Sequence, residues 1–173
     1  MTVENANKIG AKQGLISVIV GIIIAHLIMT LMISSDNGFV DGFFWITRID
    51  YWYHILIGCL IMILCGYFYG GIAGKEILIN KRNYILVGFL TGMAVLLTTG
   101  FLGGLTGFIE EGIDNIGTND NPFYDYLFKP LYWIGMFGLI PSLIVGIIFG
   151  NQIKRKGKNS AEKHSSQHQC TSL

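Results

Sequence analysis

Four long apolar segments constrain this chain more than any other feature. They cover residues 15–33, 51–71, 84–108 and 131–149, and none of them contains Lys, Arg, Asp or Glu. Each is close to the roughly 20 residues that an α-helix needs to cross the hydrocarbon core of a bilayer. Charged residues make up only 13% of the chain, against about 25% in soluble domains. The sequence therefore predicts an all-α integral membrane protein, a four-transmembrane-helix bundle whose first segment is retained rather than cleaved.

The distribution of basic residues predicts the orientation of this bundle. Of the 12 Lys and Arg residues, all but Arg48 and Lys129 lie in the N-terminal segment, the loop after the second apolar segment or the C-terminal tail. Basic loops stay in the cytoplasm, so both termini are expected to be cytoplasmic, in a plasma (inner) membrane. Residues 1–150 form the predicted transmembrane domain and residues 151–173 a disordered tail. The start of this tail is expected to bind anionic headgroups through Lys154, Arg155, Lys156 and Lys158.

Two loop segments, residues 36–44 and 120–128, resemble each other. They read D-N-G-F-V-D-G-F-F and D-N-P-F-Y-D-Y-L-F, and each is followed by a basic residue and then a Tyr-Trp pair. With one residue deleted, three glycines of the second apolar segment also align with three of the fourth: Gly58, Gly66 and Gly70 with Gly138, Gly146 and Gly150. Such self-similarity predicts two tandem, parallel-related helical hairpins, at about 12–75 and 82–154. Convergence of two ordinary outer loops is the alternative.

The same two loops are expected to form short helices in the outer interface, over residues 39–46 and 123–128. Most of the acidic side chains lie on this predicted outer face, and with two basic residues they form a candidate cluster: Asp36, Asp41, Arg48, Glu110, Glu111, Asp120, Asp125 and Lys129. One interpretation places Asp41 and Asp125 in first helical turns, where the helix dipole favours an anion. The other is a carboxylate cluster that holds a hard cation. No calcium-loop spacing is present, so no metal site is predicted.

Polar residues within the apolar segments form a second candidate site, made of His26, His54, Thr98 and Thr99. His26 lies about 12 Å from the outer end of its segment, and an ionisable residue at that depth suggests a functional site. It is expected either to form a hydrogen bond with a neighbouring helix, at Thr98 or Thr99, or to transfer protons or bind a ligand. His54 lies near the end of its segment, where an interfacial role is expected.

Glycines at helical spacing are the remaining pattern in the apolar segments. The expected packing positions are Gly66, Gly70, Gly88, Gly92, Gly100, Gly103, Gly104, Gly107, Gly146 and Gly150, several of them in GxxxG pairs. Small residues let transmembrane helices approach closely, and this interpretation is favoured over a polar path lined by threonines. Pro141 predicts a kink in the fourth segment.

The sequence contains no nucleotide-binding, metalloprotease, hydrolase or kinase motif, so no catalytic residue and no cofactor is predicted. The favoured function is a non-catalytic subunit or scaffold of a membrane complex, through self-association or a membrane-protein partner and without nucleic acid. The alternative is a small homo-oligomeric transporter or channel. A second alternative is an outward-facing lipid-modifying enzyme, which would need an acid–base pair in contact.

Overall fold

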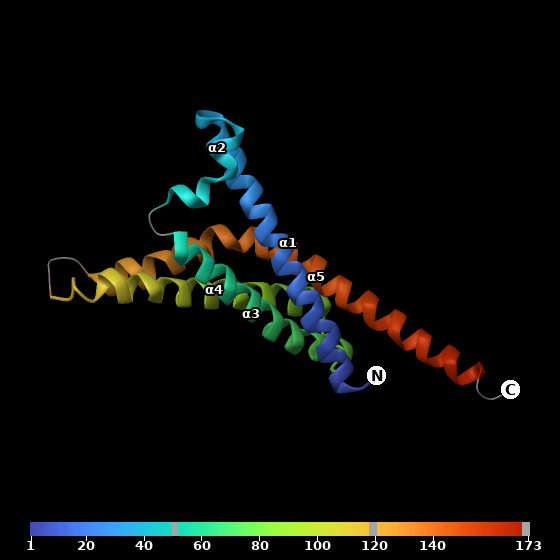
Figure 1. The fold of residues 1–173 in the computed structure, drawn as a ribbon. Helices are drawn as coiled ribbons and strands as arrows, with labels where there is room; N and C mark the ends of the chain where they lie inside the picture. The colour runs from blue at the N-terminus through green and yellow to red at the C-terminus, as the bar shows by residue number, and fades with distance from the viewer. Residues whose placement is uncertain (50–51, 118–120, 171–173) are drawn as a thin grey trace.

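The computed structural model describes residues 1–49, 52–117 and 121–170, and every regular element in these ranges is helical. Figure 1 shows the long helices and the short helical segments that follow two of them. In chain order the elements are α1 (Val3–Asn37), α2 (Phe39–Phe43), η1 (Trp45–Arg48), α3 (Trp52–Leu78), α4 (Tyr84–Gly107), η2 (Phe108–Gly112), η3 (Tyr124–Phe128) and α5 (Lys129–Cys170).

Three stretches are long and apolar enough to cross a membrane: most of α1, all of α3, and α4 together with η2. The fourth candidate consists of two helical pieces, Tyr124–Met136 and Gly138–Asn159, which meet at an angle of 58°. Pro141 explains the position of this bend, because it has no N–H to donate to the carbonyl group of residue 137. The all-helical class and three to four candidate spans are thus confirmed.

Local sequence signals explain where the helices begin and end. The Thr2 hydroxyl accepts a hydrogen bond from the Asn5 N–H at 3.3 Å and caps α1, and the Asn83 side chain caps α4 in the same way. Ser, Thr, Asn and Asp stabilise helix starts through such bonds. Helix α1 stops at Gly38, whose φ of +86° is accessible to glycine at little cost.

The two short predicted helices differ in form from the expectation. Residues 39–48 fold as α2 followed by the 3-10 turn η1. Residues 124–128 instead form the π-helical turn η3, which runs without a break into α5. The tail also differs, because α5 continues as a helix to Cys170. Its first turns beyond the apolar segment pack on the bundle: Ile153 is fully buried, and Gly157 lies against the Leu78 side chain.

Helices α1 and α3 touch backbone to backbone through glycines. A Cβ atom added to Gly14 would lie 2.1 Å from the carbonyl oxygen of Gly66, and one added to Gly10 would lie 2.2 Å from that of Gly70. One turn further, a Cβ on Gly74 would lie 2.2 Å from the carbonyl oxygen of Ala6. No side chain fits at these positions, so the absence of side chains is what allows this contact.

Helices α4 and α5 pack in the same manner. A Cβ on Gly88 would lie 2.0 Å from the carbonyl oxygen of Gly146, and one on Gly150 would lie 2.1 Å from that of Tyr84. The two helix pairs join where α3, α4 and α5 bury a small apolar core: Ala73, Ile77, Phe149 and Ile153, with Leu78, Tyr84 and Val87 packed against it.

This core lies at one end of the molecule, which we call the basic end because Lys8, Lys75, Arg82 and Lys154 surround it. The opposite, acidic end carries Asp41, Glu110, Glu111 and Asp125. Near the basic end, the Gln13 amide donates a hydrogen bond of 2.5 Å to the Gln152 side chain and connects α1 with α5. From this junction the helices diverge, and α1 with α2 stands apart from the α4–α5 pair (Figure 1).

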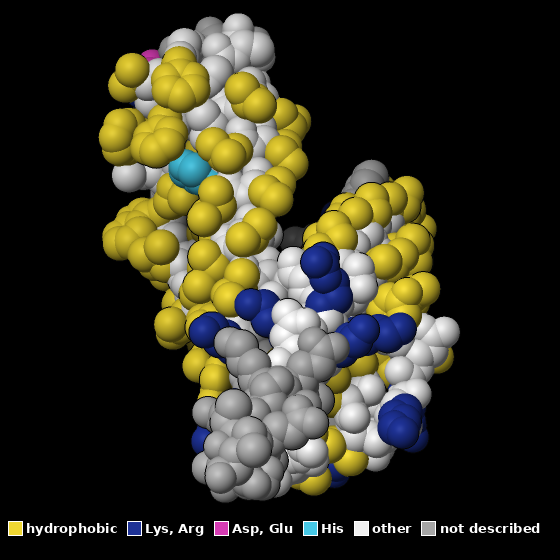
Figure 2. All heavy atoms as spheres, turned by 90° about the vertical axis from the view of Figure 1, so that its right-hand side faces the viewer, with side chains coloured by type: hydrophobic (Ala, Val, Ile, Leu, Met, Phe, Trp, Pro, Cys, Tyr) yellow, Lys and Arg dark blue, Asp and Glu magenta, His cyan; other side chains and the backbone are white. Residues whose placement is uncertain are grey.

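The divergence leaves residues 21–48, which we call the α1 arm, largely outside the bundle. Figure 2 shows two apolar lobes with a notch between them, and a band of Lys and Arg side chains below the notch. One face of α1 in this arm is aliphatic, and its side chains are between 49% and 67% exposed: Ile23, Ile24, Leu27, Ile28, Leu31 and Met32.

Candidate functional site

Four polar side chains meet at the acidic end, where α3 begins and α4 passes into η2. The Nδ1 atom of His54 lies 2.8 Å from the Thr106 hydroxyl oxygen, and its Nε2 atom lies 2.6 Å from a carboxylate oxygen of Glu110. The second oxygen of Glu110 accepts a hydrogen bond from the Tyr53 hydroxyl. These four residues form the acidic-end cluster. It brings together His54, predicted as part of the polar site within the apolar segments, and Glu110, predicted as part of the outer-face cluster.

The sequence places these groups together for local reasons. Thr106 and Glu110 are four residues apart and therefore lie on one face of the helix. Tyr53 and His54 lie in the first turn of α3, with ring centroids 4.3 Å apart. The π-helical turn at Phe108–Gly112 carries Glu110. Such turns are rare and occur frequently at functional sites.

The hydrogen-bond roles in the cluster are partly fixed. The Thr106 hydroxyl donates to the Gly103 carbonyl oxygen at 2.7 Å, so its oxygen is free to accept from the Nδ1–H of His54. Nε2 and Glu110 then share one proton, either as an imidazolium–carboxylate pair or as a neutral acid and base. The His54 side chain is 21% exposed and that of Glu110 is 41% exposed. Both side chains are therefore partly accessible at this end of the molecule, and both ring nitrogens of His54 are engaged.

Glu111, the next residue, belongs to a different contact. Its carboxylate accepts a hydrogen bond of 2.7 Å from the Tyr126 hydroxyl of η3. Close by, the rings of Phe108 and Phe123 lie 4.7 Å apart. Glu110 thus connects α4 with α3, whereas Glu111 connects it with the segment that leads into α5.

Asp41 and Asp125, the predicted first-turn acids, each pair within their own loop. Asp41 forms an ion pair with Arg48, and Asp125 lies 3.6 Å from Lys129. All four side chains are well exposed, and such pairs contribute little to stability. Asp120 and the side chain of Asp36 lie outside the described residues. Within the described part of the chain, no three His, Cys, Asp or Glu side chains are grouped as a metal site would require.

His26 contacts its own loop rather than a neighbouring helix. Its Nδ1 atom accepts a hydrogen bond of 3.2 Å from the Trp45 indole N–H, and the Phe43 ring packs edge-on against it at 5.2 Å. Neither Thr98 nor Thr99 is its partner: the Thr98 hydroxyl lies 3.1 Å from the Tyr69 hydroxyl, and Thr99 is buried. The expected contact between helices does not form because the α1 arm stands apart from α4.

The predicted packing glycines fall into several environments. Gly66, Gly70, Gly88, Gly146 and Gly150 lie at the close helix contacts described above, and Gly92 faces Ser142. Gly100 faces Ile134, while Gly104 and Gly107 face Tyr126. Gly103 has open space around its Cβ position. Gly10, Gly14 and Gly74 were not predicted as packing positions; all three lie outside the apolar segments 15–33 and 51–71.

Sequence reasoning also missed Tyr53, Thr106, Tyr126 and Trp45 as members of these contacts. The spacing of Thr106 and Glu110 was a usable signal, because a hydroxyl and a carboxylate four residues apart share a helix face. Trp45 and Tyr126 gave no signal, since their contacts depend on how each loop folds back on its helix. Comparisons with protein-family models, curated proteins and solved structures find no match.

The acidic-end cluster leads to a prediction about stability. Replacing His54 or Glu110 with glutamine is expected to destabilise the protein, and the two effects should not add. We expect a coupling free energy of about 1 kcal/mol, the upper range for a partly exposed pair. Thermal unfolding in detergent of both single variants and the double variant measures it. His54→Gln combined with Glu111→Gln is the matched control and should show additive effects.

Proposed function

We propose that this protein is a small multi-pass protein of the plasma (inner) membrane that serves as a non-catalytic subunit or scaffold of a membrane complex. The observation that carries the proposal is the α1 arm, a helix whose exposed face is aliphatic and which stands apart from the other helices (Figure 2). A hydrophobic helix of a partner protein would fill the notch beside it with the same kind of side-chain packing that joins helices elsewhere in membranes.

The distribution of charge supports the proposed orientation, with both termini and the basic end in the cytoplasm. Lys and Arg side chains gather in a band beneath the apolar lobes (Figure 2), as expected where a protein leaves the bilayer on its cytoplasmic side. Lys154, Arg155, Lys156 and Lys158 of α5 belong to this end and would contact anionic headgroups.

Equivalent contacts in the two helix pairs support duplication of a helical hairpin. Gly14 and Gly66 of the first pair take the places of Gly88 and Gly146 in the second, and one turn further Gly10 and Gly70 take those of Tyr84 and Gly150. In each pair, the first helix also contacts the loop that follows it at an equivalent position. A Cβ on Gly42 would lie 2.7 Å from the Thr30 carbonyl oxygen, and one on Gly104 would lie 2.5 Å from that of Tyr126. These pairs match the register of the repeated sequence motif.

Co-purification in mild detergent tests the scaffold function. The tagged wild type is expected to retain a membrane-protein partner in a fixed ratio, measured by mass spectrometry. Leu27→Ala with Leu31→Ala, on the arm, should weaken partner binding roughly thirtyfold, because each buried leucine at an interface contributes about 1 kcal/mol. Leu86→Ala with Leu90→Ala, two leucines on α4 that are also about half exposed or more, is the matched control. Unchanged recovery in the arm variant would refute this function.

A second function is supported by the contact of His54 with Glu110 at 2.6 Å. An outward-facing lipid-modifying enzyme needs such an acid–base pair near the headgroups, since proton transfer by a positioned side chain accelerates group transfer. If this function holds, His54→Gln should change the lipid composition of cells that express the protein while partner recovery stays intact. A scaffold would show no change in lipid composition.

A further inference from the structure

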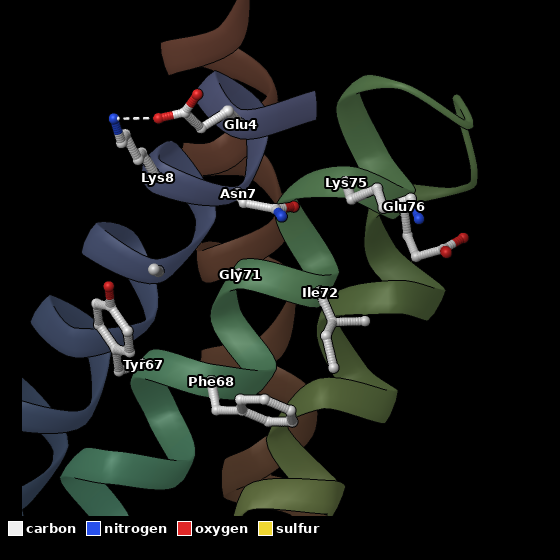
Figure 3. A pocket seen from close by; sticks show the side chains of 10 residues that line it. Glu4, Asn7, Lys8, Tyr67, Phe68, Gly71, Ile72, Lys75 and Glu76 are labelled. Atoms are coloured by element: carbon white, nitrogen blue, oxygen red, sulfur yellow. Dashed lines mark hydrogen bonds and ion pairs between the residues drawn. The ribbon is translucent and has the colours of Figure 1, made fainter. Parts of the chain in front are cut away.

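A groove of about 450 Å³ lies between α1 and α3 at the basic end (Figure 3). It is separate from the acidic-end cluster and from the α1 arm. Its lining residues come from the first three turns of α1 and the last three turns of α3: Glu4, Asn7, Lys8, Ala11, Tyr67, Phe68, Gly71, Ile72, Lys75 and Glu76.

The chemistry of the groove changes along its length. Tyr67, Phe68 and Ile72 lie towards one end, and Lys8, Asn7 and Lys75 lie towards the other (Figure 3). Tyr67 and Phe68 are largely exposed, and they continue towards the apolar surface of α3. A ligand that fits this gradient has an apolar part and a strongly polar part in the order found at a membrane surface.

Some of the charged side chains of the groove form ion pairs, and one does not. The Lys8 ammonium binds the Glu4 carboxylate at 2.7 Å, and Arg82 binds Glu76 at 3.0 Å. Lys75 is exposed and has no ion-pair partner among the residues that the structure describes. The groove therefore offers one uncommitted ammonium, with a second cation and two carboxylates close to it.

We propose that this groove binds one molecule of a glycerophospholipid with a primary-amine headgroup, of the phosphatidylethanolamine class. Lys75 binds the phosphate, with Asn7 as a further donor, and the Glu4 carboxylate accepts from the headgroup ammonium. The acyl chains follow Phe68 and Ile72 along α3. This assignment depends on the membrane location proposed above but not on the scaffold function.

Charge complementarity favours this headgroup over an anionic one. Two lysines and two carboxylates line the groove, so a purely anionic headgroup that reaches Lys75 also lies close to carboxylates and leaves them without a partner in the lipid. A dipolar headgroup pairs both of its charges, its phosphate with Lys75 and its ammonium with Glu4. Choline carries a quaternary ammonium without N–H donors, so it cannot donate a hydrogen bond to Glu4.

Native mass spectrometry of delipidated protein tests the site. The protein in detergent is titrated separately with phosphatidylethanolamine, phosphatidylglycerol and phosphatidylcholine. We expect one phosphatidylethanolamine to bind more tightly than the other two lipids. Lys75→Gln should weaken this binding roughly tenfold, the factor expected when one charge-assisted hydrogen bond is lost. Lys12→Gln is the matched control, because Lys12 is an exposed lysine on α1 that does not line the groove.

A second variant narrows the groove without removing charge. A Cβ on Gly71 would lie 3.7 Å from the Asn7 carbonyl oxygen and 3.8 Å from the Ala11 Cβ, which are ordinary contact distances. Gly71→Ala should therefore keep the fold, narrow the groove and weaken lipid binding. Equal affinity for all three lipids, or equal binding by the Lys75→Gln and Lys12→Gln variants, would overturn the proposal. Neither result depends on whether a protein partner is recovered.

Discussion

Replacing Gly14 with alanine is expected to destabilise the protein by about 1–3 kcal/mol, the usual cost of an overpacked contact. The added methyl group would lie 2.1 Å from the Gly66 carbonyl oxygen. Backbone atoms on both sides of this contact belong to long helices, so no rotamer change relieves the clash. The two helices must move apart instead, and the contacts on either side of Gly14 weaken with it.

A control on the same helix isolates this effect. Gly21 has open space around its Cβ position, so Gly21→Ala gains about 1 kcal/mol of helix propensity and loses no contact. Thermal unfolding in detergent, followed by circular dichroism, should place the Gly14→Ala variant below the wild type and the Gly21→Ala variant at or above it. If both variants unfold at the same temperature, the close approach of α1 and α3 is not a feature of the folded protein.

Replacing Gly88 with alanine is expected to have a similarly large effect on the second helix pair. Its Cβ atom would lie 2.0 Å from the Gly146 carbonyl oxygen, so α4 and α5 must separate. Gly103→Ala on α4 and Gly135→Ala on α5 are the controls, because no atom lies near either Cβ position. Both controls should unfold at or above the wild-type temperature.

Combining the two substitutions tests how far the helix pairs depend on each other. Gly14 and Gly88 lie in different pairs, so the effects of Gly14→Ala and Gly88→Ala should add within about 0.5 kcal/mol if each pair is an independent packing unit. The measurement is the unfolding temperature of the double variant against the two single variants. A double variant no less stable than either single variant would contradict this independence.

Much of the fold could be predicted because long apolar segments without charged residues, and a proline inside one of them, are easily recognised in the sequence. Of the uncharged segments, residues 15–33 lie within α1, residues 52–71 within α3 and residues 84–107 within α4, and Pro141 indicated the bend in α5. The positions of the helix ends were harder to predict. Helix α1 begins at Val3 because a threonine cap and a Glu4–Lys8 pair extend it beyond the apolar segment. Helix α5 runs past residue 150 because Ile153 is buried against the core.

The site was less predictable, since it depends on how helices and loops meet. His54 and Glu110 were both noted, but the sequence does not encode their distance, which depends on the way α3 and α4 pack. For His26 the expected partners lay on another helix, whereas the observed partner, Trp45, lies 19 positions further along the chain in its own loop. Gly103 and Gly104 were both predicted as packing positions from their GxxxG spacing, yet only Gly104 faces another backbone. Adjacent residues point in different directions around a helix, so the rotation of α4 about its own axis determines which of the two glycines contacts a neighbour.

Because the buried core lies near one end of α1, a small tilt of the helix there moves its other end by a larger distance. The helix is 35 residues long, and at 1.5 Å per residue about 35 Å of it extends from Gly14 to its far end. A tilt of about 5° at the glycine contact therefore displaces that end by about 3 Å, roughly half the pitch of an α-helix. Small changes at the basic end, such as a lipid leaving the groove or a methyl group entering the α1–α3 contact, are thus magnified along the α1 arm and are largest at its far end.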